Sequence, residues 1–93
     1  MKSIYKYPLQ LEHKQTIKAP ITRALNVQEQ HGRPCMWAEV ETEDKPKEWT
    51  VYAVLTGIGP MPPFGAHYLS TVQFDGGALV VHYFICEEDG QDD

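Results

Sequence analysis

The 93-residue sequence has few cysteines and no long apolar run. Its two cysteines, Cys35 and Cys86, are too few for the disulfide framework of a small secreted domain, and neither stands in a Cys-x-x-Cys pair. No stretch approaches the roughly 18 apolar residues that span a bilayer, and the N-terminus lacks the apolar segment of a signal peptide. These absences predict a protein of a reducing cytoplasm with two free thiols; a single Cys35–Cys86 disulfide is the alternative.

The sequence also lacks an excess of positive charge, because eight lysines and arginines face thirteen acidic residues, for a formal net charge of −5. Five of the acids lie in residues 87–93, so residues 1–86 are neutral. We therefore predict a single β domain over 1–86 and an acidic disordered tail over 87–93. This balance argues against nucleic acid as the partner. A smaller anion could still bind to the basic residues Lys2, Lys6, Lys14, Lys18 and Arg23.

The arrangement of apolar residues predicts an all-β fold. Short segments rich in alternating or β-branched residues recur along the chain: Ser3–Tyr7, Lys14–Ala19, Thr22–Gln30, Cys35–Thr42, Trp49–Thr56, His67–Phe74 and Ala78–Cys86. A helix over 19–30 is the competing interpretation of the third segment, but it would lack a second apolar turn. His31-Gly32 fits a two-residue hairpin turn. About seven short strands at this spacing predict a compact antiparallel sandwich or small barrel.

Three of these segments are apolar on both faces, namely 35–38, 49–55 and 78–86. A single open sheet of this size would leave one of those faces in water. Either a second layer of the same chain or another copy of the chain must cover it. We expect a homo-oligomer, because so many apolar positions in so short a chain leave few monomeric arrangements without an exposed patch.

The residue types that carry chemistry do not form a recognisable set. The four histidines have no metal-ligand spacing, and both cysteines stand in apolar runs, where a thiol is usually inert. Gly57-x-Gly59 resembles part of a phosphate loop, but Pro60, Pro62 and Pro63 exclude the helix that such a loop requires. We therefore expect no enzyme, no metal and no cofactor. The proline-rich segment 57–65 is either a ligand-binding loop or a structural crossover.

Several segments spread over nearly the whole chain carry a resemblance: Met1-Lys2-x-Ile4-Tyr5-Lys6-Tyr7-Pro8-Leu9, Gln15-Thr16-Ile17, Val27-Gln28-x-Gln30-x-Gly32-x-Pro34-Cys35-Met36-Trp37-Ala38-x-Val40, Thr56-Gly57 and Gly76-Gly77-Ala78-Leu79-Val80-x-His82. On these motifs the sequence resembles a family of small, mostly uncharacterised bacteriophage proteins. The family typically has a Gly-Thr-Gly-His stretch where this chain has Leu55-Thr56-Gly57-Ile58-Gly59. The resemblance implies a protein used against the host, in the host cytoplasm.

The leading hypothesis is a non-enzymatic phage protein that counters host defence by sequestering a nucleotide immune signal, cyclic or derived from ADP-ribose, in a homo-oligomeric pocket. Flat aromatic rings and phosphate donors would form this site, and the candidates are Arg33, Trp37, Trp49, Gly57, Gly59, Phe64 and His67. For Trp37 and Trp49 a place in the core is the alternative, and for Arg33 a place beside the hairpin turn. The alternative functions are a protein–protein inhibitor or adaptor of a host or phage protein, in which an exposed aromatic edge or the tail binds, and a minor virion structural protein.

Overall fold

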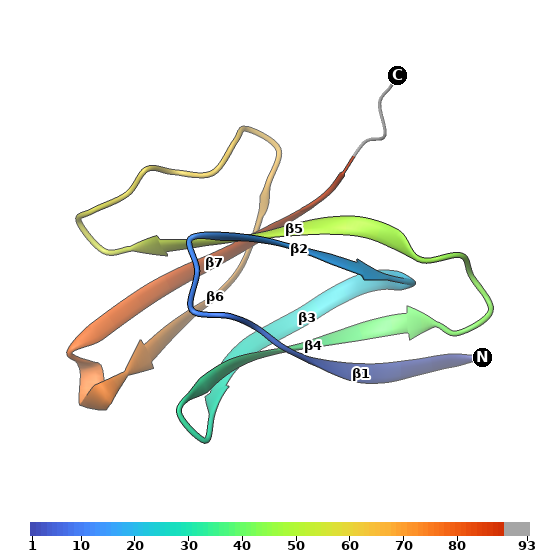
Figure 1. Ribbon diagram of the computed structural model, residues 1–93, viewed down its shortest axis with the longest axis horizontal. Coiled ribbons are helices and arrows are strands. Elements are labelled where there is room, and N and C mark those ends of the chain that lie inside the picture. The colour runs from blue at the N-terminus through green and yellow to red at the C-terminus, as the bar shows by residue number, and fades with distance from the viewer. Residues whose placement is uncertain (89–93) are drawn as a thin grey trace.

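A computed structural model describes residues 1–88 and shows seven strands with a single turn of 3-10 helix, η1 (Asp75–Gly77), before the last strand (Figure 1). The strands are β1 (Lys2–Pro8), β2 (Lys14–Ala19), β3 (Ile21–Gln30), β4 (Arg33–Glu41), β5 (Lys47–Leu55), β6 (His67–Phe74) and β7 (Leu79–Glu87). The predicted all-β fold is confirmed, and 21–30 is a strand rather than a helix. In the described part of the chain, no helix is long and apolar enough to cross a membrane.

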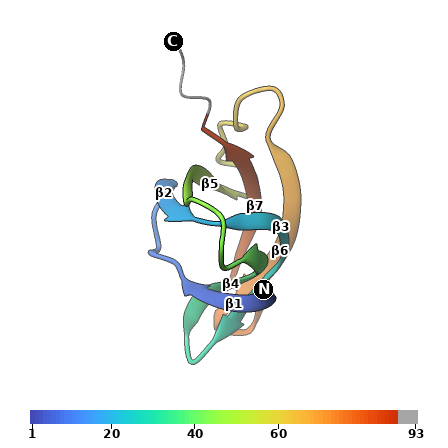
Figure 2. The ribbon, with the colours of Figure 1, turned by 90° about the vertical axis from the view of Figure 1, so that its right-hand side faces the viewer.

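The strands form two antiparallel sheets, ordered β1-β4-β3 and β2-β5-β7-β6 (Figures 1 and 2). The predicted turn joins β3 to β4, since His31 and Gly32 have φ values of 55° and 81°, as a type I′ turn requires. On one side of the sandwich β3 lies against β6, where the Val27 N–H donates to Ser70 Oγ over 2.8 Å. No backbone ladder joins these two strands, so the fold is a sandwich and not a closed barrel.

The core lies between the two sheets and follows the two-residue period of the strands. In β4 the alternate side chains Met36, Ala38 and Val40 are fully buried, each at 0% exposure. Val51, Val81 and Tyr83 meet them from the other sheet as part of the same buried cluster. The second layer that the sequence required is therefore the chain's own second sheet.

The outer face of β5 is buried as well, and neighbouring strands account for part of this. Tyr52 is 8% exposed, although it points away from the core cluster. The Lys14 ammonium lies 5.9 Å from the centre of its ring. Phe84 is the register partner of Tyr52 in β7, and Tyr68 packs edge-on against Phe84 at 5.7 Å. Side chains of the same sheet thus cover much of this face.

The side of the sandwich opposite β3 and β6 is open, because β1 and β2 are the edge strands of their sheets and do not pair with each other. Each edge strand carries two lysines four positions apart and therefore on one face, Lys2 and Lys6 in β1 and Lys14 and Lys18 in β2. Charged side chains on an edge strand oppose pairing with another chain. The open edges are therefore protected.

The C-terminal end of β7 extends beyond the predicted start of the tail. Glu87 belongs to the strand, the Glu88 N–H donates to the Glu48 carbonyl over 2.8 Å, and the Glu88 carboxylate accepts from the Thr50 hydroxyl. The rest of the predicted tail, 89–93, lies outside the described residues.

Candidate functional site

The seven residues predicted to bind a ligand lie in several parts of the molecule. Gly57, Gly59 and Phe64 belong to the segment between β5 and β6, and His67 begins β6. The other three lie elsewhere. Trp37 is half-buried in β4 and alternates with the core residues on either side of it, so it faces outward. Trp49 packs against the core, and its indole Nε1–H donates to the Ala19 carbonyl over 3.2 Å.

Arg33 is exposed at the start of β4, next to the hairpin turn, as the alternative prediction had it. It shares a shallow hollow with Leu9, Gln10, Leu11 and Glu12, which form the connection between β1 and β2. Trp49, in contrast, borders a polar depression between Pro20 and Lys47. Arg33, Trp49 and Gly59 line three different hollows.

An apolar hollow of about 340 Å³ lies beside the end of β5 and the start of β7. We call it the apolar hollow. Ala53, Leu55, Val81 and Tyr83 line it from the inner face of the β2-β5-β7-β6 sheet, and Leu11, Glu12 and His13 line it from the β1–β2 connection. Ile58 and Gly59 come from the segment after β5, and Leu79 from the start of β7. The sandwich is therefore left uncovered at this end.

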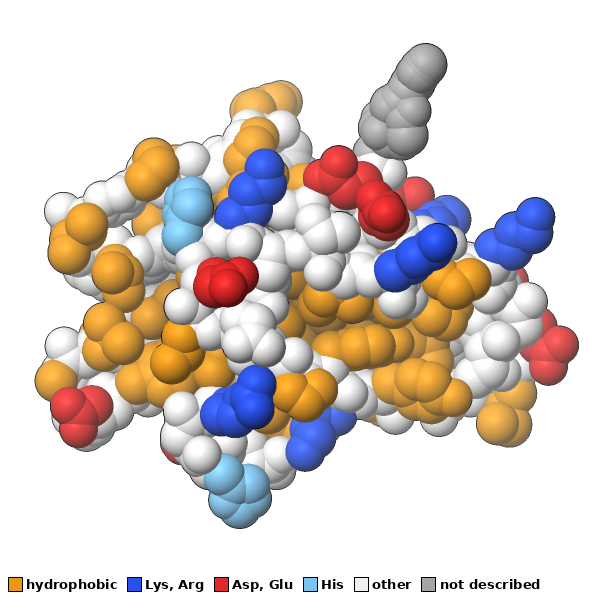
Figure 3. Space-filling view, viewed as in Figure 1, with side chains coloured by type: hydrophobic (Ala, Val, Ile, Leu, Met, Phe, Trp, Pro, Cys, Tyr) orange, Lys and Arg blue, Asp and Glu red, His pale blue; other side chains and the backbone are white. Residues whose placement is uncertain are grey.

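Three large apolar side chains that line this hollow are exposed to solvent: Leu11 at 68%, Ile58 at 73% and Leu79 at 39%. Met61 and Phe64, in the same crossover as Ile58, are exposed at 69% and 107%. We call these five residues the apolar face. Figure 3 shows one group of hydrophobic side chains on the left of the view, where Figure 1 places the crossover, and a broader group right of centre, between β1 and β2.

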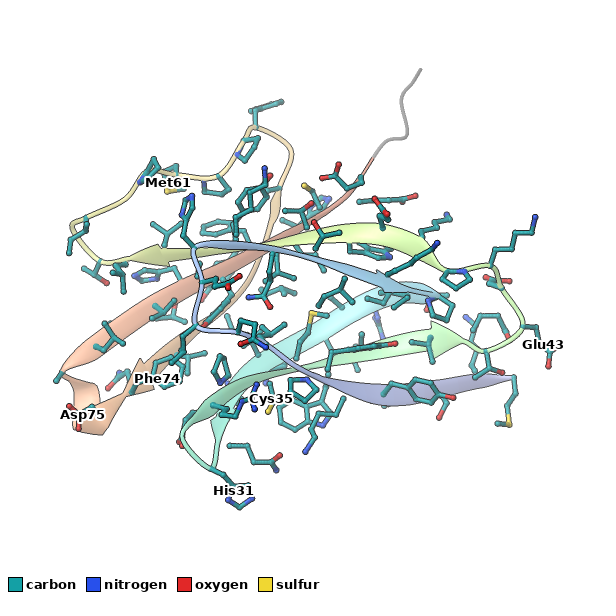
Figure 4. The ribbon with its side chains drawn as sticks, in the orientation of Figure 1. His31, Cys35, Glu43, Met61, Phe74 and Asp75 are labelled. Carbon is teal, nitrogen blue, oxygen red and sulfur yellow. The ribbon has the colours of Figure 1, made fainter. Side chains whose placement is uncertain are left out.

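Local sequence shapes the crossover, residues 56–66. Its prolines, Pro60, Pro62 and Pro63, fix φ and give up three backbone N–H donors, so the segment continues neither strand. Gly57 and Gly65 turn the chain at its two ends with φ values of 79° and 101°. Figure 4 shows Met61 in the crossover at the upper left of the molecule. The segment is a crossover, as one reading predicted, and it also presents apolar side chains to solvent.

Beneath the hollow, the side chain of Tyr83 is buried, with 1% of its surface exposed. Burial raises its pKa from the usual 10.0 to about 12, because the phenolate would lose its hydration. No hydrogen bond within residues 1–88 satisfies the hydroxyl. A buried hydroxyl without a partner is costly, so we expect its removal to stabilise this part of the sheet.

Leu11 also borders a second hollow, of about 510 Å³, on the other side of Leu79. We call it the acidic hollow, because Glu29 and Asp75 line it together with Phe74. Figure 4 shows Phe74 and Asp75 at the lower left, at the same end of the molecule as Met61. The apolar and acidic hollows share Leu11 and Leu79 and so adjoin each other.

A chain of polar side chains crosses the outer face of the β2-β5-β7-β6 sheet. His82 Nε2 lies 2.7 Å from the Thr56 hydroxyl, its Nδ1 lies 3.0 Å from the Thr71 hydroxyl, and Thr71 in turn lies 2.7 Å from the Tyr68 hydroxyl. Sequence spacing gave no sign of this chain, since it joins β6, β7 and the first residue of the segment after β5. A hydroxyl beside an imidazole is half of a nucleophile–base arrangement. Here both ring nitrogens contact hydroxyl groups, and no carboxylate of residues 1–88 orients the imidazole.

The basic residues proposed to bind an anion are partly neutralised. Glu39, on the outer face of β4, lies 3.1 Å from Lys2 Nζ and 3.5 Å from Arg23 Nη2. The hydrogen bond from Lys2, followed by one from Thr22, lowers the pKa of Glu39 below its usual 4.5. No group of three metal-ligating side chains occurs in the part of the chain that the structure describes. The outer face of the β1-β4-β3 sheet is thus an ion-paired surface.

The described chain is a small two-sheet antiparallel sandwich with an apolar hollow at one end and a stiff apolar crossover beside it. By sequence it belongs to the DUF7352 family, a domain of unknown function, whose family model matches residues 1–92. Neither the curated proteins nor the solved structures contain a match to the chain.

Proposed function

We propose that this chain is a non-enzymatic binding protein that captures a partner protein on the apolar face. The observation that carries the proposal is the placement of three exposed apolar side chains, Leu11, Ile58 and Leu79, around an apolar hollow of about 340 Å³. A contiguous apolar patch of this kind typically marks a protein–protein interface. A hollow beside it can receive an anchoring side chain of the partner.

The energetics favour this function. Full burial of a leucine, isoleucine or phenylalanine side chain contributes about 1.5–3 kcal/mol. The three prolines of the crossover restrict its backbone before binding, which lowers the entropy lost when a partner docks. Met61 supplies a flexible side chain that adapts to the surface it meets. A few such contacts would support a specific complex.

Sequestration of a nucleotide is the second candidate, and it has less support from the geometry. A nucleotide site needs cationic or backbone donors for phosphate and a flat ring for the base. Trp37 and Trp49 lie apart from Gly57 and Gly59, and the apolar hollow has Glu12 and His13 as its charged or titratable members besides Tyr83. Thermal-shift titration with cyclic and ADP-ribose-derived nucleotides tests this candidate; a saturable rise in melting temperature would favour it over protein capture.

The biological setting that we propose comes from the resemblance to small bacteriophage proteins. On that resemblance, the partner is a host protein of the cytoplasm, and its capture would block a defence function. A homo-oligomeric state likewise stays a prediction. Neither is needed for the binding surface itself, which depends only on the residues of the apolar face.

Affinity purification from the producing cells with three forms of the chain tests the proposal. The forms are the natural sequence, Leu11→Ser/Ile58→Ser and the control Ile4→Ser, whose isoleucine is 60% exposed on the other sheet. A specific partner should be retained by the natural chain and by the control and lost by the double variant. If all three forms retain the same partner protein, or none of them retains one, the result contradicts binding of a partner through the apolar face.

A further inference from the structure

The charged residues beside the apolar face are predominantly acidic. Glu12 lines the apolar hollow, and Glu29 and Asp75 line the acidic hollow that adjoins it. Within residues 1–88, no lysine or arginine lines either hollow. Arg33 lines the shallow third hollow, which shares Leu11 and Glu12 with the apolar hollow, but it forms no ion pair with Glu12 within residues 1–88. An occupant that spans the apolar and acidic hollows would meet three carboxylates and one histidine.

These carboxylates are not neutralised within the described chain. Its ion pairs involve Glu39, Glu41, Glu43 and Glu87, but not Glu12, Glu29 or Asp75. Glu29 accepts a hydrogen bond from the Gly32 N–H over 2.6 Å, which holds its carboxylate near the hairpin turn. Asp75 has a positive φ of 53° in the turn between β6 and β7. Both turns therefore bring negative charge to the acidic hollow.

The geometry points to an occupant that is apolar at one point and basic beside it. We propose that the partner docks a segment with a large apolar side chain in the apolar hollow and with lysine or arginine residues directed toward Glu12, Glu29 and Asp75. This inference rests on the proposed function and specifies the partner's chemistry. Complementary charge at the edge of an apolar contact accelerates association and excludes wrong partners.

The same charges argue against a second copy of the chain as the occupant. In a two-fold dimer through this face, the same patch contributes from both subunits. Glu12, Glu29 and Asp75 of one subunit would then lie near those of the other, and like charges across an interface are unfavourable. A basic partner meets no such repulsion.

Three short synthetic peptides with the same leucine- and tryptophan-containing centre test this inference. They differ only in flanking residues, which are all lysine, all glutamine or all glutamate. Fluorescence anisotropy should give the order lysine, glutamine, glutamate from tightest to weakest binding, with the lysine peptide about tenfold tighter than the glutamate peptide at low salt. Binding of the glutamate peptide as tightly as the lysine peptide would overturn the inference.

A matched pair of variants separates local from overall charge. Glu12→Gln/Glu29→Gln/Asp75→Asn removes three negative charges around the hollows, and Glu43→Gln/Asp44→Asn/Glu48→Gln removes three near the β4–β5 turn. Figure 4 shows Glu43 at the opposite end from Asp75, along an axis of 40 Å. The first variant should weaken lysine-peptide binding about tenfold and the second less than about twofold.

Equal weakening by the two variants would overturn the inference, because the attraction would then come from net charge. If the first variant is unfolded by circular dichroism, Glu12→Gln alone takes its place, since Glu12 lies in the connection between β1 and β2. Failure of all three peptides to bind also overturns it. The affinity purification described above decides the proposed function independently. A purified partner that proves to be another copy of this chain would support the apolar face and overturn the basic partner.

Discussion

The open edge strands and the apolar face expose the molecule to other chains in different ways. The edges β1 and β2 offer unpaired backbone, but two lysines on each strand protect them. The apolar face exposes Leu11, Ile58 and Leu79 with no lysine or arginine of the described chain among the residues that line its hollow. In Figure 3, hydrophobic side chains are visible in both regions. The difference indicates that the fold opposes association at its edges and permits it at the apolar face.

The largest expected effect comes from removing the protection of β2. Lys14→Val/Lys18→Val replaces both edge lysines by a good strand former and removes the ammonium above Tyr52. We expect concentration-dependent association through the exposed edge, measured by sedimentation velocity. Arg33→Val/Lys45→Val, beside the β3–β4 turn and in the β4–β5 turn, is the matched control, since it also removes two exposed positive charges. If both variants sediment alike, the lysines do not protect the edge and the comparison fails.

Tyr83→Phe tests the stability of the sheet beneath the apolar hollow. The substitution removes a buried hydroxyl that has no partner in residues 1–88, so the free energy of unfolding should rise by about 1 kcal/mol. Urea denaturation at neutral pH measures it. A loss of stability instead would show that the Tyr83 hydroxyl has a hydrogen-bond partner in solution.

The same residue gives a pH dependence. The pKa of Tyr83 in the folded chain, about 12, lies above its usual 10.0. Between these values the unfolded chain releases a proton that the folded chain keeps, so stability falls as pH rises from 10 to 12. The loss is of order 2 kcal/mol. Tyr83→Phe should remove this component; an equally steep fall in the variant would assign it to other groups.

The smallest effect belongs to the ion-paired outer face of the β1-β4-β3 sheet. The pKa of Glu39 is lowered in the folded chain, so its stabilising contribution is present above the usual pKa of 4.5 and disappears as pH falls through the lowered value. Glu39→Gln should lower the melting temperature slightly at pH 7 and leave it unchanged in acid. A variant that melts lower by the same amount at both pH values would place the role of Glu39 in packing rather than in charge.

Local features of the fold were predictable from the sequence, and contacts between distant segments were not. The alternation in 35–42 and the positive φ required by His31-Gly32 specified a strand and a turn. The seam between Val27 and Ser70 joins β3 to β6 across 43 positions, and no local pattern signals it. Hydrophobic patterning predicts which face of a strand is buried, but not which strand covers it.

The candidate site was likewise predictable where it depends on local sequence and not where it depends on contacts between distant segments. Segment 57–65 stood out by its prolines and glycines, and Gly59 does line the apolar hollow. Leu11 gave no signal, because a single leucine in a polar connection has no periodicity, yet it borders three hollows. Trp37 and Trp49 attracted attention by residue type alone; Trp37 lies in the other sheet, and Trp49 lies near the end of β5 that is farther from this loop.

Site-specific photocrosslinking tests the central claim most directly. A photoreactive amino acid is placed at Ile58 or at Ile4, two isoleucines exposed at 73% and 60% on different parts of the molecule. In the producing cells, illumination should yield a discrete crosslinked partner protein from position 58 and none from position 4. The same product from both positions, or a product from position 4 alone, would contradict the assignment of the apolar face as the binding surface.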